Sequence, residues 1–356
     1  MRNIQKQTLL CFLSFFLLML SCTKKENIEV TAPKISHPEE VLNYIKSMGY
    51  PESSILDAGA EYIVEGDIAF PKDMTLPEDT GRVATEEQYY SGNLVSKSRQ
   101  SNIKIRIDPA LAAVQNAEFN AAVTLWNNSG SNIHFIIVTT GEDILVKNTD
   151  LMAGTCGQAP LPINGLPGNL IDIDVAEVNG QNFNQRMINI AHEIGHTIGF
   201  KHTNGVGTGV FIDVPGWAGA DANSIMNGNM CGVLPTVLSA KDIGAVKALY
   251  PFPTPQNVRI DITSSQFIIR WDPVVSNDFI GYTVDYSGFS GVNFGNSVSL
   301  SSIVTSSYTV PGVTPYPTSG QTQTGGIQAT VKAKYTGGII MAAPTVSRNK
   351  VNGVWQ

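Results

Sequence analysis

Apolar and polar positions alternate most regularly in the middle of the chain, where they predict a sheet covered by helices. Ile103, Ile105 and Ile107 alternate with polar residues, which is the period-two pattern of a strand with one buried face. Three further apolar runs have the length of strands: residues 133–138, 143–146 and 170–175. A helical repeat follows the first strand, with its apolar face at Leu111, Val114, Ala117, Ala121, Leu125 and Trp126. The pattern predicts an α+β domain in which helices pack on a mixed sheet.

The residues before this domain have a weaker pattern of their own. Val41, Leu42 and Ile45 recur at helical spacing, and Gly49 is placed to end that helix. A short strand is predicted within residues 61–70, whereas the residues that follow are polar and poor in periodicity. We interpret residues 36–99 as a small pro-region or N-terminal module.

A change in composition marks a further domain after residue 251. Pro251, Pro253 and Pro255 indicate a linker, and strand-like alternation dominates beyond them. Three runs each place apolar residues on one face of a strand: Phe267, Ile269 and Trp271; Tyr282, Val284 and Tyr286; and Ile327, Ala329, Val331, Ala333 and Tyr335. Several such strands in about 100 residues predict an all-β sandwich over residues 252–356.

This C-terminal pattern resembles a fibronectin type III domain. The resemblance rests on Val258, Trp271-Asp272-Pro273, Gly281 to Tyr286, Tyr308-Thr309-Val310 and Val331-Lys332-Ala333. It implies one of two roles, either the binding of a glycan or protein ligand or the passive role of a spacer.

The first 21 residues have the features of an export signal. Arg2 and Lys6 give a positive start, and residues 9–20 are apolar except for Cys11 and Ser14. Spanning a bilayer takes about 20 residues, so this run is too short for a comfortable membrane helix. Cys22 follows this segment directly, and Ser21-Cys22 resembles a bacterial lipobox, whose cysteine is acylated and becomes the first residue of the mature protein.

The lipobox resemblance implies an outer-membrane lipoprotein of the bacterial cell envelope. Thr23 stands where inner-membrane lipoproteins often carry aspartate, and residues 22–35 then form a polar tether. We expect acylated Cys22 to anchor the protein in outer-membrane lipid, facing either the periplasm or the cell surface. The alternative is a plain signal peptide cleaved nearby.

Composition excludes several classes of protein. The chain has 356 residues, of which 42% are hydrophobic and 15% charged, with 33 glycines and 19 prolines. These values exclude a disordered chain and a coiled coil, and they favour β-rich domains with many loops. The net charge of −7 becomes −9 once Arg2 and Lys6 are removed with the signal. We therefore expect no nucleic-acid partner.

Two of the four cysteines remain after export and lipidation. Cys11 lies in the signal and Cys22 carries the lipid, which leaves Cys156 and Cys231. Because the cell envelope is oxidising, we expect a disulfide between them, and the alternative is two buried free thiols. Two widely separated cysteines are a poor basis for a metal site.

The residues with the clearest chemistry lie between His192 and His202. Three of the five histidines fall within these eleven residues, with Glu193 beside the first. His192 and His196 are four positions apart, so on a helix both imidazoles project from one face, as two ligands of one zinc ion require. A continuing helix would carry His202 about 15 Å along its axis. Gly199 can take a positive φ, end the helix and return the chain, so that His202 completes the site.

This pattern, H-E-x-x-H-x-x-G-x-x-H, resembles the signature of the metzincin zinc metallopeptidases at each fixed position. The residues at positions 192–200, H-E-I-G-H-T-I-G-F, are similar to those of the bacterial HEIGH-type metallopeptidases. Residues 224–227 resemble the family's Met-turn, which implies that Met226 lies beneath the zinc ligands. Residues 238–250 resemble the last catalytic helix, with Ser239 as its N-cap and Asp242 at the third helical position. The resemblance covers residues 100–251 and implies a metzincin-like domain with a zinc helix.

Three departures limit what the resemblance implies. Astacin-like and serralysin-like members carry a tyrosine two residues after the Met-turn methionine, whereas this chain has Gly228, so no tyrosine switch is expected. Thr203 follows the third histidine and matches none of the best-known subfamilies. The N-terminal module has no cysteine, so a matrixin-type cysteine switch cannot operate.

The ligand count predicts the reaction. Three neutral imidazoles leave a fourth zinc position for water, whose pKa the ion lowers to about 7. Glu193 would take a proton from that water during attack on a peptide carbonyl and deliver a proton to the departing amine. We expect a zinc endopeptidase acting on proteins or peptides. The alternative is a surface adhesion or binding protein with a structural or vestigial zinc centre.

Asp172 and Asp174 lie on a predicted strand shortly before the zinc helix. We expect them to be solvated strand positions, because isolated Asp-x-Asp pairs are common. The alternatives are that they border the substrate cleft or bind a structural calcium ion.

Overall fold

The computed structural model describes residues 37–76, 89–204, 212–217, 220–228, 231, 235–289, 294–302, 304–316, 325–352 and 354–356. The predicted signal peptide, Cys22 and the tether lie outside these ranges. Within them, every helix is too short or too polar to cross a membrane.

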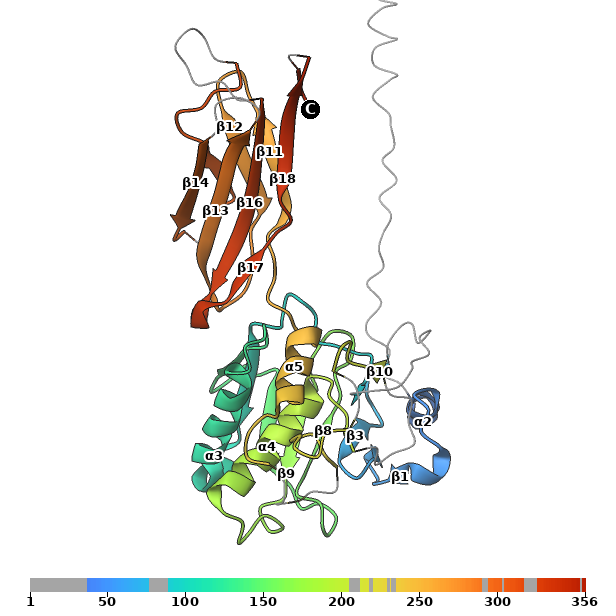
Figure 1. The fold of residues 1–356 in the computed structure, drawn as a ribbon. Coiled ribbons are helices and arrows are strands. Elements are labelled where there is room, and N and C mark those ends of the chain that lie inside the picture. Colours follow the sequence, from blue (N-terminus) through green and yellow to red (C-terminus); the bar gives the residue numbers. More distant parts are fainter. Residues whose placement is uncertain are drawn as a thin grey trace, which may run out of the picture. The chain divides into compact units, whose positions relative to one another are not determined.

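The larger domain is built on an eight-stranded mixed sheet (Figure 1). Its strands lie in the order β1-β2-β3-β8-β9-β7-β5-β6. Their bounds are β1 (Leu56–Asp57), β2 (Glu61–Val64), β3 (Ile68–Pro71), β5 (Ile103–Ile107), β6 (Phe135–Ile137), β7 (Ile144–Asn148), β8 (Gly157–Pro160) and β9 (Leu170–Ile173). Strands β5, β6, β7 and β9 run parallel, whereas β8 is antiparallel to β9. The predicted mixed sheet is therefore confirmed. β8 was not predicted, because its sequence Gly-Gln-Ala-Pro shows no strand-like alternation.

Three helices accompany the sheet. They are α3 (Pro109–Asn127), α4 (Phe183–Thr197) and α5 (Ala240–Leu249). The predicted cap of α5 is confirmed, because Ser239 and Asp242 form a reciprocal capping box at its N-terminus. A short pair of strands, β4 (Tyr89–Tyr90) and β10 (Ile212–Asp213), completes this domain.

The predicted apolar face of α3 is partly wrong. Val114 is 58% exposed, whereas Gln115 and Phe119 are buried. The cause is a kink, because Gln115 has non-helical backbone angles (φ −137°, ψ 23°) that interrupt the regular helical repeat. After the kink, the helix buries Phe119, Ala122, Val123 and Trp126.

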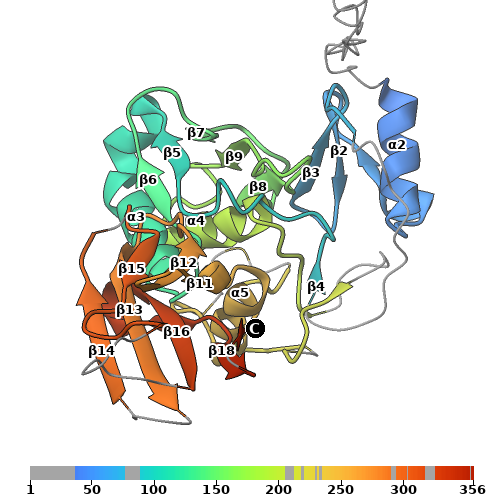
Figure 2. The same cartoon turned by 90° about the horizontal axis from the view of Figure 1, so that it is seen from above.

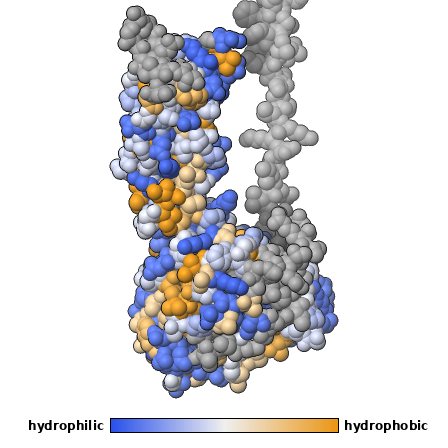
Figure 3. All heavy atoms as spheres, viewed as in Figure 1, coloured by the Kyte–Doolittle hydropathy of each residue, from blue (hydrophilic) through white to orange (hydrophobic). Residues whose placement is uncertain are grey.

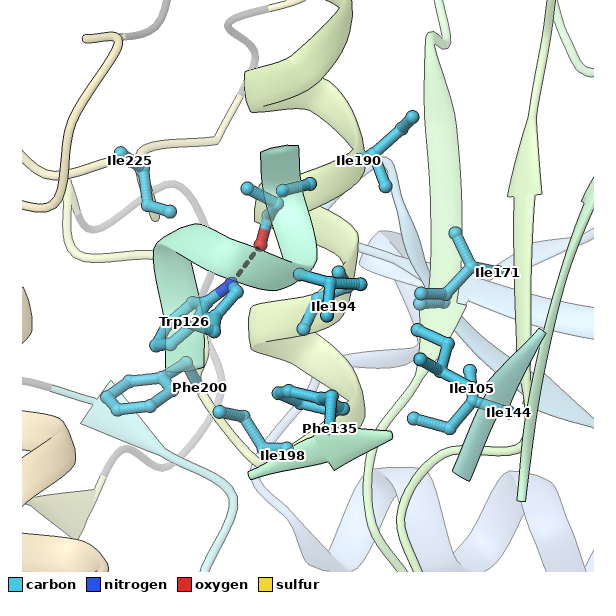
Figure 4. Close-up of a cluster of buried hydrophobic side chains, with 14 of the residues drawn as sticks. Ile105, Trp126, Phe135, Ile144, Ile171, Ile190, Ile194, Ile198, Phe200 and Ile225 are labelled. Carbon is cyan, nitrogen blue, oxygen red and sulfur yellow. Dashed lines mark hydrogen bonds between the residues drawn. The ribbon is translucent and has the colours of Figure 1, made fainter. Parts of the chain in front are cut away.

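The core of the larger domain fixes the position of α4. Trp126 of α3 donates a hydrogen bond from Nε1 to the backbone oxygen of Ala191 at 2.8 Å, and its ring stacks on Phe200 with 5.7 Å between centroids (Figure 4). Ile190 and Ile194 of α4 are fully buried in the same cluster. The indole thus holds α4 at the residue before His192.

The N-terminal module joins the larger domain through its sheet. Helix α2 (Pro38–Ser47) lies beside β2 and β3 (Figure 2), and a one-turn helix, η1 (Glu52–Ser54), precedes β1. Their buried side chains form a separate cluster: Val41, Tyr44, Ile45, Tyr50, Tyr62, Val64, Ile68, Phe70 and Leu161. Strand β3 pairs with β8 of the larger domain, so the sheet continues across the predicted boundary at residue 99.

The C-terminal domain contains two antiparallel sheets around one core, which confirms the predicted all-β sandwich. Its elements are β11 (Gln256–Ile262), β12 (Phe267–Asp272), β13 (Phe279–Phe289), β14 (Phe294–Leu300), β15 (Ser307–Thr309), β16 (Gly326–Tyr335), η2 (Thr336–Gly338), β17 (Ile340–Ala342), β18 (Val346–Val351) and β19 (Val354–Trp355). The alternating apolar residues predicted for β12, β13 and β16 are all buried. Polar and apolar side chains are interspersed on the face of this domain seen in Figure 3.

Candidate metal centre

Helix α4 presents the first two histidines side by side. The helix begins with a capping box between Asn182 and Gln185 and ends at Thr197. His192 and His196 lie on its last turns, and their Nε2 atoms are 3.0 Å apart. The predicted spacing therefore brings two imidazole nitrogens close enough together to bind one ion.

Gly199 brings the third histidine to the same point. Its φ of 104° is left-handed, and a Cβ at this position would lie 2.8 Å from the backbone oxygen of Asn93. The chain turns back here, so that His202 Nε2 lies 3.2 Å from His192 Nε2. All three histidines are buried.

The outer nitrogens of two imidazoles are engaged by the backbone. His192 Nδ1 donates to the oxygen of Ile225 at 2.6 Å, and His196 Nδ1 donates to the oxygen of Phe200 at 2.8 Å. A neutral imidazole that donates from Nδ1 carries a lone pair on Nε2, so these lone pairs face one another. Converging lone pairs repel unless a cation lies between them, so the donor set fits a metal ion such as Zn²⁺.

Asp67 of the N-terminal module completes a set of four donors. Its carboxylate oxygens lie 3.1 Å from His202 Nε2, 3.4 Å from His192 Nε2 and 3.6 Å from His196 Nε2. Tetrahedral zinc with bonds of about 2.0 Å needs ligand atoms roughly 3.3 Å apart, and the observed separations are of this size. Asp67 was missed from the sequence, because it lies 125 positions before His192 in a polar turn with no recognisable spacing.

Glu193 lies beside the ligands but is not one of the four. Its side chain is buried, and Oε2 has no hydrogen-bond partner among the described residues. It lines a cavity of about 90 Å³ together with Asn189, Asn227 and the Cys156–Cys231 pair. Burial, together with the negative charges of Asp67 and Asp172, raises the pKa of Glu193 well above its usual value. A carboxyl group in such a site is suited to exchange protons.

Met226 packs against helix α4 at Gly195, which lies between His192 and His196 in the sequence. It is 1% exposed, and a Cβ on Gly195 would lie 2.4 Å from its sulfur atom. Asp242 holds this segment, because its carboxylate accepts hydrogen bonds from Ser224 Oγ and from the Ile225 backbone N–H. Asp242 was predicted at the third position of helix α5, and the structure adds its contact with the segment whose Ile225 oxygen accepts from His192.

The segment after Met226 packs against the third histidine. A Cβ on Gly228 would lie 2.4 Å from Nδ1 of His202, so a larger residue here would displace that ring. The Thr203 hydroxyl donates a hydrogen bond to Asn227 Oδ1 at 2.6 Å, and the Thr203 backbone N–H donates to the backbone oxygen of Met226. Thr203 thus joins the two segments, and Gly228 gives His202 the room that it needs.

The structure contains a disulfide between Cys156 and Cys231, as expected, with Cα atoms 5.4 Å apart. It lies next to β8 and lines the same cavity as Glu193. The bridge closes a chain segment that contains the whole histidine motif.

The expectation that Asp172 and Asp174 are solvated is wrong. Their exposed fractions are 5% and 3%. Asp174 accepts backbone hydrogen bonds from Leu151, Ala176 and Glu177, so its carboxylate caps two turns. Asp172 accepts from the Thr149 hydroxyl, and Lys147 lies 3.5 Å away. These partners account for both buried charges.

Residues 62–250 match the family model described as "Dual-action HEIGH metallo-peptidase", a span of 189 of the 356 residues. A sequence comparison with curated proteins gives no significant match. Similar solved structures include myroilysin, which is 17% identical over 48% of this chain and 92% of that one (TM-score 0.33). A hatching-enzyme zinc protease from the medaka fish, Oryzias latipes, is 16% identical over 48% and 98% (TM-score 0.33). The third fibronectin III domain of human KIAA0343 protein is 18% identical over 28% and 82% (TM-score 0.23).

Proposed function

Because the chain belongs to the dual-action HEIGH metallo-peptidase family, we propose that it is a lipid-anchored zinc endopeptidase in which Glu193 is the catalytic base. Its class as a zinc metallopeptidase follows from the family. The observation that supports the mechanism is a buried carboxyl group, without a hydrogen-bond partner on Oε2 among the described residues, beside three converging imidazoles. The substrates of such a centre are proteins or peptides, whose peptide bonds it hydrolyses.

His192, His196 and His202 would hold the ion, with the first two rings oriented by backbone oxygens. Zinc bound there supplies a Lewis acid that lowers the pKa of water and polarises a carbonyl. Glu193 takes the proton from the attacking water and later delivers a proton to the leaving amine.

A structural zinc centre in a surface binding protein is the second candidate. The observation in its favour is Asp67, since structural zinc sites have four protein ligands and catalytic sites have three. The observation against it is Glu193, because a purely structural site has no use for a buried carboxyl group without a partner on Oε2. The two candidates differ in whether the protein cleaves peptides.

Cleavage of internal peptide bonds is the test of the proposed function. Zinc-loaded full chain and its Asp67→Ala variant should be incubated with a diverse peptide library, and the products identified by mass spectrometry. We expect internal cleavage that a chelator abolishes and added zinc restores. Failure of both zinc-saturated proteins to cleave any peptide would contradict the endopeptidase proposal.

The proposed anchor is the acylated Cys22, which places the enzyme at the outer membrane of a bacterial envelope. Replacing Cys22 with serine should remove the acyl mass from the N-terminus and shift the protein from the membrane fraction to the soluble fraction. Mass spectrometry of the N-terminal peptide and fractionation measure both effects. The proposal is wrong if the wild-type peptide carries no acyl group.

We propose that the C-terminal sandwich binds a glycan or protein, or else acts as a spacer. Its fibronectin III-like fold supports either role, since folds of this kind serve many functions.

A further inference from the structure

The C-terminal sandwich has a cleft where strand β11 of one sheet lies beside strand β18 of the other (Figure 1). Its volume is about 470 Å³, which is within the range of sites for small organic ligands. Arg348 of β18 donates from Nε to the backbone oxygen of Ile260 in β11 at 3.3 Å, so the two strands are joined at the cleft. The residues that line the cleft are Ile260, Asp261, Ile262, Tyr316, Arg348 and Trp355.

Two aromatic rings of the cleft are accessible to a ligand. Tyr316 is 49% exposed, and Trp355 is half-buried. The indole of Trp355 is held on two sides, because Nε1 donates to the backbone oxygen of Pro315 at 3.1 Å and the ring packs edge-on against Phe267 with 5.0 Å between centroids. A ring that is already fixed loses little conformational entropy when a ligand binds. The C–H faces of a sugar ring pack well on such rings, because the aromatic face carries a partial negative charge.

Two cations lie beside these rings without a counter-ion. Lys350 Nζ is 5.1 Å from the ring centroid of Tyr316 and 5.9 Å from that of Trp355. Neither Lys350 nor Arg348 forms an ion pair with any residue that the structure describes, and their side chains donate to backbone oxygens instead. The bond from Nε of Arg348 leaves its two terminal nitrogens to a ligand.

One carboxylate lines the cleft, but neighbouring arginines offset its charge. Asp261 Oδ2 accepts from Arg270 Nε at 2.6 Å, and Arg259 Nε lies 3.6 Å from Oδ1. With Arg348 and Lys350, these groups comprise four cations and one anion, in a chain whose net charge is −7. The local excess of positive charge favours an anionic ligand.

We infer that this cleft binds an acidic oligosaccharide, with a uronate carboxylate on Arg348 and a sugar ring against Tyr316 and Trp355. The inference rests on the binding role proposed for the sandwich and is independent of the peptidase proposal. A guanidinium group binds a carboxylate through two parallel hydrogen bonds, which suits a uronate. An added peptide strand fits less well, because the Ile260 oxygen already accepts from Arg348. A proline-rich peptide would use the rings and leave both cations without a partner.

Isothermal titration calorimetry of the full chain measures the expected binding. The probes are trigalacturonate, trimannuronate and a hyaluronan tetrasaccharide, with maltotriose as a neutral saccharide and tetraglutamate as an anion without sugar rings. At least one uronate should bind with a Kd below about 1 mM, and at least about tenfold more tightly than maltotriose or tetraglutamate. Because the cleft is open to solvent, raising the ionic strength about tenfold should weaken this binding.

Variants of two exposed side chains assign the binding to the cleft. Arg348→Ala should weaken uronate binding at least about tenfold, because it removes a charged hydrogen-bond donor. Tyr316→Ala should weaken it about threefold or more, because it removes a stacking ring. Arg348→Lys keeps the charge without the paired donors, so it should lose less affinity than Arg348→Ala, and it replaces that variant if the latter folds poorly. Lys332→Ala is the control, because Lys332 pairs with Asp285 and does not line the cleft.

The inference is wrong if no uronate binds, or if maltotriose or tetraglutamate binds as tightly as the uronates do. It is also wrong if Arg348→Ala and Tyr316→Ala bind uronates like wild type. That last result would keep a glycan-binding role for the sandwich and reject only this cleft as its site. Peptide cleavage is measured separately, so failure of the inference leaves the peptidase proposal untouched.

Discussion

Replacing Glu193 with alanine in the Asp67→Ala chain should lower peptide hydrolysis at least about 100-fold while zinc remains bound. The substitution keeps all three imidazoles, so the metal has the same protein ligands. It removes the group that takes the proton from water, so the chemical step loses its base. The measurements are kcat/KM on a cleaved peptide and the zinc content of the purified protein.

Glu142→Ala is the matched control, because Glu142 pairs with Arg106 and lies outside the set of residues around the metal. It should leave both kcat/KM and zinc content near their starting values. The role of Glu193 as a base is wrong if Glu193→Ala keeps near-normal cleavage, or if it loses zinc as readily as a ligand variant does.

Replacing His202 with alanine should weaken zinc binding and abolish activity together. Mutation of a group that only supports a ligand costs about 10- to 100-fold in metal affinity, so loss of a ligand itself should cost at least about 100-fold. Because zinc binds the folded chain, the zinc-dependent rise in the thermal midpoint should shrink as well. Competition with a chromophoric chelator and thermal unfolding with and without zinc measure these effects.

His134→Ala is the control for this change, since it removes a histidine that is not among the four metal-facing residues. It should retain the zinc affinity of the parent chain. An unchanged zinc affinity in His202→Ala would show that His202 is not a ligand, whatever happens to activity.

Local sequence rules were enough to predict three of the four metal-facing residues. His192 and His196 follow from helical spacing, and His202 follows from the glycine that ends the helix. The alternating residues of the C-terminal strands are equally local, and their burial was predicted correctly. These features depend on residues within about a dozen positions of one another. Over that distance the geometry of a helix or strand determines which residues share a face.

The remaining features depend on contacts between distant segments. Asp67 reaches the centre because β3 pairs with β8 and so extends the sheet. The pairing of two strands so far apart in the sequence leaves no pattern from which it could be predicted. The burial of Asp172 and Asp174 is explained by Thr149, Lys147 and backbone N–H groups that meet them only in the folded domain. The kink at Gln115 likewise changes which face of α3 is buried, although the apolar residues of this helix recur at regular helical spacing.

The close packing of Gly228 against His202 restricts how this centre can evolve. A tyrosine two residues after the methionine, as in some metzincins, cannot be gained here by one substitution, because even its Cβ would lie 2.4 Å from Nδ1 of His202. Any first step at position 228 passes through a protein with a displaced ligand. A side chain at 228 therefore requires a shift of the His202 ring, so substitutions at the two positions should have non-additive effects on metal binding.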